Sequence, residues 1–426
     1  MKLLLAAVSL AAAVFGGAGV ATWLVEQRLA ALLPGGLVFD SLHYNPLTGR
    51  LALRHVRGSD EGGREIFRAD EVTATAPAMD LLAGVVTLQR LQVASPRLVV
   101  PAAPMMRLIG LGPAAPRTVP IAVSGLVVTH GALVIEGAAH GEPLVVGEVA
   151  VRADRMAAFG GDGAFAVEMA LYGTSVRMTG QRALGAPGYA VHVRARGLDA
   201  VAALRDFPSL MAGSGVSLVG GRADIDGTLL FAEQGILASG QVRLERVLAR
   251  FADRALSPFS AAAIILAVDR WDVEAGVGRI SRLELRAPRL SVSLRHRVPA
   301  LLTSLLDVFA DDGIVLRRIR VVEGQLTLDV PHGPLTLRRL DLALQARERL
   351  AGTGFVLSGR AGVGPEGHVA VEGALSRDLR SAEGALRAGG VKAGSCTVSD
   401  ATVPLPEQPT LESLVAALAA TCATPL

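Results

Sequence analysis

The chain has 426 residues, of which 51% are apolar, 4% are aromatic and 48 are glycine, and its formal net charge is +3. Apolar mass in Ala, Val and Leu, with many glycines, suits a long sheet with many turns better than a compact globule built on aromatic anchors. Lysine occurs only at Lys2 and Lys392, and the arginines are scattered singly among acidic residues, which argues against a nucleic-acid-binding surface.

An uncharged apolar segment lies near the start of the chain. Residues 3–25 carry no charge and follow Lys2. This segment is long enough to span a bilayer as a helix, and Trp23 near its end suits an interfacial anchor. We predict a transmembrane anchor over 1–28. A cleaved signal peptide is the alternative, because residues 19–21 are small.

The next region predicts short strands separated by turns. Alternation of apolar and polar residues begins at 38–43, and the segment 45–49 (NPLTG) predicts a turn before a strand over 50–56. Residues 145–193 read as consecutive strands with glycine-rich turns, and 198–211 as a short helix. Several short strands at regular spacing indicate an all-β architecture.

A thirteen-residue pattern with apolar residues in two period-two runs occurs four times, and Pro or Gly stands at its ninth position. The first two copies start 35 residues apart and the last two start 36 residues apart. Period two places the apolar side chains on one face of a strand, and Pro or Gly marks a turn or a bulge. The repetition predicts similar strands stacked side by side. The copies are residues 88–100, 123–135, 280–292 and 316–328.

Each pair of copies encloses a stretch that does not read as strand. Residues 101–120 are rich in proline, and 299–312 carry apolar residues at helical spacing, so both predict small helical inserts. We predict a tandem duplication, with 29–215 as the first repeat and 216–395 as the second. Chance coincidence of short β patterns is the alternative.

The C-terminal tail, residues 396–426, differs from the rest. Residues 410–422 read as an amphipathic helix, and both cysteines of the chain, Cys396 and Cys422, lie in this tail. In an oxidising compartment they could form a disulfide that holds the helix as a cap over the end of the sheet. Two unpaired buried thiols are the alternative.

No pattern in the chain points to catalysis. The eight histidines are not at metal-motif spacing, and His140 and His332, which occupy matching places before glycines, fit polar turns. Nucleophile-elbow, P-loop and complete dinucleotide motifs are missing from the sequence. We predict that the protein is not an enzyme and that it uses no metal and no cofactor.

Several segments resemble a known family. An apolar N-terminal segment is followed by NPLTGRLALRHV at 45–56, LQRLQVASPRLVV at 88–100, and VEGQLTLDV and LTLRRLDLAL within 322–344. Over roughly residues 1–390 this combination resembles the AsmA-like proteins of Gram-negative envelopes, which include TamB and YdbH relatives. The short length and the cysteine-containing tail depart from that family.

The resemblance implies a mainly β fold: an N-terminal transmembrane helix in the inner membrane, then a long curled antiparallel β-sheet in the periplasm that forms an apolar groove. It implies binding of phospholipid or other lipid acyl chains, a contribution to phospholipid transport or outer-membrane integrity, and room for another envelope protein as partner. The alternative is a scaffolding protein of the envelope with a packed β-sandwich core. The predicted groove lining is the last apolar pair of each thirteen-residue copy: Leu98, Val100, Leu133, Ile135, Leu290, Val292, Leu326 and Leu328.

Overall fold

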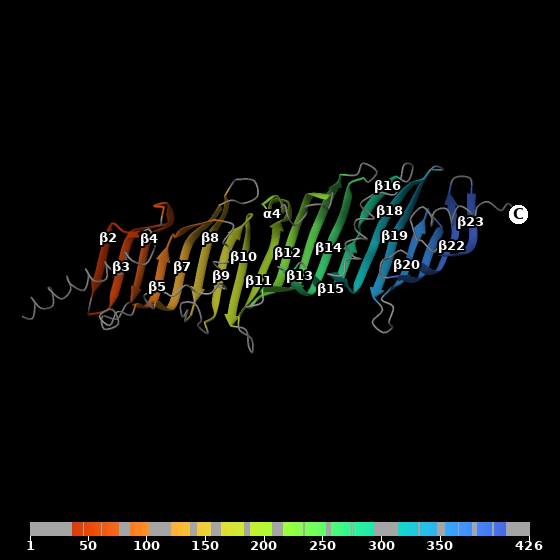
Figure 1. Ribbon diagram of the computed structural model, residues 1–426. Helices are drawn as coiled ribbons and strands as arrows, with labels where there is room; N and C mark the ends of the chain where they lie inside the picture. Colours follow the sequence, from red (N-terminus) through yellow and green to blue (C-terminus); the bar gives the residue numbers. More distant parts are fainter. Residues whose placement is uncertain are drawn as a thin grey trace, which may run out of the picture. The chain divides into compact units, whose positions relative to one another are not determined.

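The fold is mainly β. In a computed structural model, strands make up most of the described chain, and the single described helix is α4 (Ala200–Asp206) (Figure 1). The strands form a large curled sheet. The described residues are 36–45, 47–60, 62–75, 86–101, 121–136, 143–154, 163–182, 188–206, 216–232, 235–252, 257–273, 275, 277–293, 314–330, 333–346, 354–364, 366–376, 381–393 and 396–405.

The chain divides into two compact units. Unit 1 comprises Met1–Arg194 and Leu230–Gln234, and unit 2 comprises Ala195–Leu229 and Gly235–Leu426. Two strands, β11 (Gly188–Asp199) and β12 (Val216–Ala232), contribute residues to both. Helix α4 begins after Asp199, whose carboxylate accepts hydrogen bonds from Val201 N at 2.9 Å and Ala202 N at 3.0 Å and so caps the first turn.

Unit 1 contains strands that pair mostly with their neighbours in sequence. The predicted turn at 45–49 joins two of them: Asn45 Oδ1 accepts Leu47 N at 3.0 Å, and Gly49 has a φ of 68°. The strands are β1 (Leu37–Val38), β2 (Ser41–Asn45), β3 (Arg50–Ser59), β4 (Glu65–Thr75), β5 (Val86–Ala94), β6 (Arg97–Pro101), β7 (Ile121–Glu136), β8 (Leu144–Ala153), β9 (Phe165–Leu171) and β10 (Thr174–Arg182).

Unit 2 contains mostly longer strands, and its last five pair as an antiparallel meander. The strands are β13 (Gly235–Phe251), β14 (Phe259–Asp272), β15 (Val277–Arg286), β16 (Arg289–Ser293), β17 (Ile314–Leu316), β18 (Arg318–Val330), β19 (Gly333–Ala346), β20 (Gly354–Val363), β21 (Gly367–Ser376), β22 (Ala382–Ala393) and β23 (Cys396–Pro404).

The thirteen-residue copies lie side by side, as predicted, but they pair in parallel. In unit 1, β5 and β6 pair with β7 so that Leu88 is opposite Val123 and Leu98 is opposite Leu133. In unit 2, β15 and β16 pair in the same way with β17 and β18. The spacing of 35 or 36 residues is therefore the register offset of each parallel pair. The prediction of a wholly antiparallel sheet was wrong here, because 102–120 and 294–313 are long enough to make the crossover that parallel strands require.

A line of left-handed backbone crosses neighbouring strands in each unit, and we call it the bend line. At the eighth position of every thirteen-residue copy the residue has a φ between 44° and 56°, although none is glycine. At the same level further left-handed residues lie on β8 and β19, which flank the copies, and on β3 and β13, which are separated from the copies by β4 and β14. At this level the register shifts between β7 and β8 and between β18 and β19, as at a β-bulge, which bends the strand. The register is unshifted there between β3 and β4 and between the parallel strands. The bend line consists of His55, Ser95, His130 and Glu148 in unit 1, and Arg246, Ala287, Glu323 and Arg339 in unit 2.

The bend line explains one difference from the predicted strands. The predicted strand over 38–43 is interrupted at Asp40, which lies opposite His55 and pairs with its ring at 3.1 Å. Both flanking segments, β1 and β2, keep one common register with β3. The left-handed His55 in β3 therefore interrupts the ladder hydrogen bonds to the paired strand at Asp40, while the register between the two strands stays the same.

Several predictions fall on residues outside the described ones: the transmembrane anchor, the helical inserts at 102–120 and 299–312, and the tail helix. Within the described part of the chain, no helix is long and apolar enough to cross a bilayer. Helix α4 lies within the predicted helix over 198–211; residues 198–199 belong to β11, and 207–211 lie outside the described residues. The duplication and the domain boundaries at 215 and 395 stay predictions.

Candidate functional site

One face of the sheet in unit 1 carries an unbroken row of aliphatic side chains, which we call the unit 1 row. Its members are directly paired from strand to strand, across eight strands. Five consecutive strands contribute valine at this level. At about 4.8 Å per strand the row is roughly 34 Å long. The row consists of Leu42, Leu53, Val72, Val93, Val128, Val151, Val167 and Met178.

Unit 2 has two such rows on one face. The first unit 2 row crosses nine strands, and the second unit 2 row runs beside it. The first consists of Leu244, Ile264, Leu285, Val321, Leu342, Gly359, Val371, Leu386 and Val403. The second consists of Val242, Leu266, Leu283, Ile319, Leu344, Leu357, Gly373 and Gly384. We call the face that carries these rows the apolar face of each unit.

The opposite face is mixed at the same level. In unit 1 its directly paired residues are His43, Ala52, Thr73, Gln92, Val127, Arg152, Ala166 and Thr179. Alternation along each strand therefore separates the two faces, as period two requires. The apolar face is a property of the whole unit rather than of one strand.

The apolar face is only partly shielded by the described residues. In the unit 1 row Leu53 and Val93 are buried, at 3% and 9% exposure, whereas the other members keep part of their surface exposed. The buried members belong to a cluster with Tyr44, Leu51 and Val56, all on strands of this same sheet. In the described part of unit 1, the burial thus comes from neighbours within one sheet and not from a second sheet stacked on it.

The bend line keeps the apolar face continuous along each strand. In β3, Leu51, Leu53 and Val56 are buried while the consecutive residues Arg54 and His55 both point to solvent. The same two-residue outward step occurs at 70–71 in β4 and at 129–130 in β7. One extra residue in each strand therefore returns the apolar side chains to the same face beyond the bend.

The hydrogen bonds at the bend line are the same in both units. Ser95 N donates to Thr129 O at 2.9 Å and Ala132 N donates to Pro96 O at 2.7 Å. In unit 2 the equivalent bonds are Ala287 N to Val322 O at 2.8 Å and Gln325 N to Pro288 O at 2.7 Å. The carbonyl of the proline at the ninth position accepts a hydrogen bond from the partner strand. In the partner copy the ninth position is glycine.

The predicted lining residues come together in neighbouring pairs. Leu98 pairs with Leu133 and Val100 with Ile135, and in unit 2 Leu290 pairs with Leu326 and Val292 with Leu328. They divide into two kinds. Leu98 is 38% exposed, and Leu133, Leu290 and Leu326 are partly exposed. The final residue of each copy is packed instead: Val100, Ile135, Val292 and Leu328 are 5%, 7%, 1% and 2% exposed.

The rows themselves were not among the predicted lining residues. Their members in the thirteen-residue copies are the apolar residues at the fourth and sixth positions, and the remaining members come from strands outside the copies. Strand alternation was visible in the sequence, but the register that aligns β8, β9 and β10 with β7 is set by hairpin turns and bulges that have no spacing signal. The 35-residue offset of the copies was visible in the sequence, but the prediction of an antiparallel sheet did not interpret it as a parallel register.

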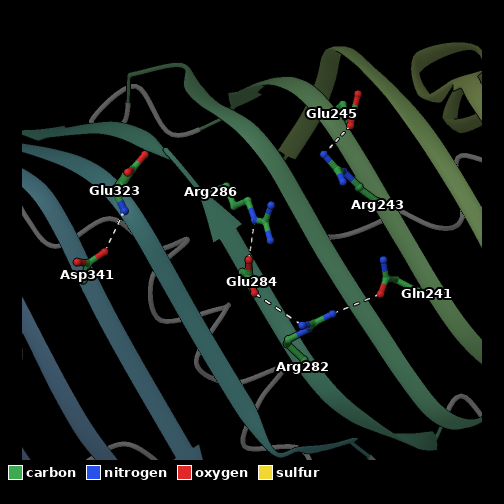
Figure 2. A network of polar contacts seen from close by, with 8 residues as sticks. All are labelled: Gln241, Arg243, Glu245, Arg282, Glu284, Arg286, Glu323 and Asp341. Atoms are coloured by element: carbon green, nitrogen blue, oxygen red, sulfur yellow. Dashed lines mark hydrogen bonds and ion pairs between the residues drawn. The ribbon is translucent and has the colours of Figure 1, made fainter.

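A charged network covers part of the polar face in unit 2 (Figure 2). Glu284 is the one buried charged residue in the described chain, and Arg286 Nε donates to its Oε1 at 2.6 Å. Arg282 lies 3.9 Å from the other oxygen and donates to Gln241 Oε1 at 3.3 Å. Arg243 pairs with Glu245 at 2.8 Å. The charged residues lie on β13 and β15, on either side of β14, where Ala263, Ile265 and Ala267 pair with them. The network is accounted for by charge compensation around the buried Glu284.

The described residues offer little for acid–base or metal chemistry. No group of three or more His, Cys, Asp or Glu side chains in the described part of the chain could hold a metal ion. Burial raises the pKa of Tyr44 in the unit 1 cluster. Cys396 is the first residue of β23, and Cys422 lies outside the described residues, so the disulfide stays a prediction.

Comparison with family models, with curated proteins and with solved structures finds no match for this chain. The resemblance to AsmA-like proteins therefore stays a prediction from the sequence.

Proposed function

We propose that this protein binds lipid acyl chains along the apolar face of its sheet, without catalysing a reaction. The observation that carries the proposal is the unit 1 row, in which eight strands in succession place an aliphatic side chain at one level and most of those side chains remain partly exposed. A surface of this kind is costly in water and is compensated when it contacts another apolar group.

The composition of the rows favours an alkyl ligand over a protein. The unit 1 row and the first unit 2 row contain only Leu, Ile, Val, Met and one Gly. Centres of protein interfaces are enriched in Tyr, Trp and Arg, which both rows lack. Burying alkyl groups contributes about 0.8 kcal/mol per CH₂, and half of a ~30 Å hydrocarbon core corresponds to one acyl chain. A row of roughly 34 Å is therefore long enough for about two acyl chains end to end.

The cellular setting is part of the same proposal. Residues 3–25 would anchor the chain in the inner membrane, with the sheet in the periplasm, where lipid held on the apolar face would serve phospholipid transport or outer-membrane integrity. The rival proposal is an envelope scaffold whose apolar face is a dry packed core.

The test replaces Val128, Val151 and Val167 of the unit 1 row with threonine. Val→Thr keeps the shape and the β-branching but places a hydroxyl on the apolar face. A hydroxyl buried without a partner costs about 1 kcal/mol or more, so three of them should weaken lipid binding roughly 100-fold. The matched control makes the same Val→Thr change at Val99 in β6, Val127 in β7 and Val145 in β8. These three valines lie on the opposite face of the sheet.

The measurement is lipid extraction and native mass spectrometry on the purified full chain, together with titration of a fluorescent fatty acid. We expect bound phospholipid in the unchanged chain and in the control triple variant, and loss of it in the row variant. Protein that is folded and free of lipid in all three forms would overturn the lipid proposal and favour the scaffold.

A further inference from the structure

Three arginines lie directly opposite one another on neighbouring strands of unit 1, and we call them the arginine row. Arg57 in β3 pairs with Arg68 in β4, which pairs in turn with Arg97 in β6. All three are exposed. At about 4.8 Å per strand, the backbones of the first and the last are roughly 10 Å apart. Like charges in directly opposite positions destabilise a sheet, so the row is unfavourable unless negative charge lies beside it.

The arginine row lies on the face of the sheet opposite to the apolar face. The directly paired residues Phe67 and Leu98, next to the row along β4 and β6, are on the apolar side. On the other side of the row along β3 and β4, respectively, are Val56, which is 1% exposed, and Ala69, which is 0% exposed. Well-packed neighbours therefore hold the backbone of the row, and its side chains project from fixed positions.

Described carboxylates compensate only the middle arginine. Glu65 binds Arg68 with both of its oxygens: Arg68 Nε lies 2.9 Å from Oε1, and Nη2 donates to Oε2 at 3.1 Å. Asp70 lies two residues further along β4 and forms no ion pair with a described residue. Within the described part of the chain, the side chains of Arg57 and Arg97 have no ion pair and no hydrogen bond. Two guanidinium groups, one on each side of Arg68, are therefore without a counter-charge.

Unit 2 carries a different set of residues at the corresponding level. Arg289 occupies the tenth position of its thirteen-residue copy, directly after the proline, as Arg97 does in unit 1. Its directly paired neighbours are Ser260 and Gln325, which are uncharged. The arginine row is therefore not a consequence of the repeated strand pattern. Arg289 provides a matched arginine that has no arginine directly opposite.

An anion with several charged oxygens would supply the missing charge. Arginine presents a planar fork of N–H donors that binds the oxygens of a carboxylate or a phosphate in pairs, as Arg68 does with Glu65. The row ends at Val38 on one side and at Ala132 on the other, so its positive charge is confined to three strands. A patch of this size suits a single small group better than a long polyanion.

We propose that the arginine row of unit 1 binds a phosphate group, held mainly by Arg57 and Arg97. The same chemistry fits the phosphate of a lipid headgroup and free phosphate, and the choice of probe separates these two sources. The site is on the face opposite to the apolar face, and it does not depend on acyl-chain binding there.

The test is phosphorus NMR titration of the full chain, purified without phosphate. The probes are inorganic phosphate and glycerol phosphate, which is a lipid headgroup without acyl chains. Bonds between charged groups are strong, so Arg97→Gln should weaken binding of the better probe about tenfold, and the double change Arg57→Gln with Arg97→Gln about 100-fold. The matched control, Arg289→Gln, should leave binding unchanged.

Equal or tighter binding of glycerol phosphate would assign the site to headgroups, and tighter binding of inorganic phosphate would assign it to free phosphate. If the unchanged chain binds neither probe, or if Arg97→Gln and Arg289→Gln weaken binding equally, the site is overturned.

Urea unfolding gives a second, independent measurement. Without phosphate, Arg97→Gln should be at least as stable as the unchanged chain, because it removes repulsion within the row. Added phosphate should raise the unfolding midpoint of the unchanged chain and of Arg289→Gln, and raise it less in the double variant. An equal rise in all three would mean that phosphate acts elsewhere and would contradict the proposal.

Discussion

Ala287 tests whether the bend line is a strained backbone feature or an incidental one. Its φ is 44°, and it precedes Pro288 in the third thirteen-residue copy. A left-handed conformation costs an L-residue about 1–2 kcal/mol, and glycine avoids this cost. Glycine also lowers the stability by about 0.5–1 kcal/mol, because it loses more conformational entropy on folding than alanine does. Ala287→Gly should therefore stabilise the fold by about 0.5–1 kcal/mol, while its N–H still donates to Val322 O at 2.8 Å.

The opposite substitution should have the opposite effect. Ala287→Val puts a β-branched side chain into the left-handed region and should destabilise by about 1–2 kcal/mol. The control is Ala343, which lies within β19 between Arg320 and Ser358 on ordinary strand backbone. There glycine should destabilise by about 0.5–1 kcal/mol, and valine should be neutral or slightly stabilising.

The assay is urea unfolding of the full chain, followed by circular dichroism, with the denaturant dependence checked for constancy among the variants. The expected order of stability at 287 is Gly, Ala, Val, and at 343 it is reversed. If glycine destabilises position 287 as much as position 343, the left-handed backbone there is not strained and the reasoning is wrong.

Two further predictions concern the polar network and the unit 1 cluster. Glu284→Gln should destabilise the fold by about 1–2 kcal/mol, because a charge-assisted hydrogen bond to Arg286 is lost while both arginines stay partly solvated. The difference in stability, measured by urea unfolding, should shrink at about 1 M salt. An unchanged difference would contradict a charge effect. Burial raises the pKa of Tyr44 above its usual value of 10.0, so its contribution to stability is fully present below pH 10 and is lost as the pH rises through the folded pKa. Stability should therefore fall above about pH 10 in the unchanged chain and fall less in Tyr44→Phe, as measured by denaturant unfolding between pH 9 and 11; equal slopes would show that Tyr44 is not the group responsible.

Much of the strand content was readable from period-two alternation, because a half-buried strand requires it. The predicted strand over 50–56 lies in β3, and the strands predicted within 145–193 correspond to β8, β9, β10 and β11. The direction of pairing was not readable. Alternation is the same for parallel and antiparallel neighbours. The length of the connection between two strands decides their direction, because parallel strands need a long crossover. The segments between the copies were predicted as helical inserts, but their length was not used to predict parallel pairing.

The position of the apolar face could not be predicted from the sequence, because it depends on the register between strands. The eighth and ninth positions of each copy were read as a turn or bulge, but a bulge matters through what its neighbours do at the same level. Ser95 alone would only bend one strand; Ser95 beside His130, with Glu148 on the flanking strand β8 and His55 two strands away on β3, bends a sheet. Likewise Val128 alone is an ordinary strand valine, and only its register with Val93 and Val151 makes it part of a continuous apolar row. Both features arise from the register between strands. The only part of this register that is visible as a spacing in the sequence is the 35- or 36-residue offset of the parallel pairs.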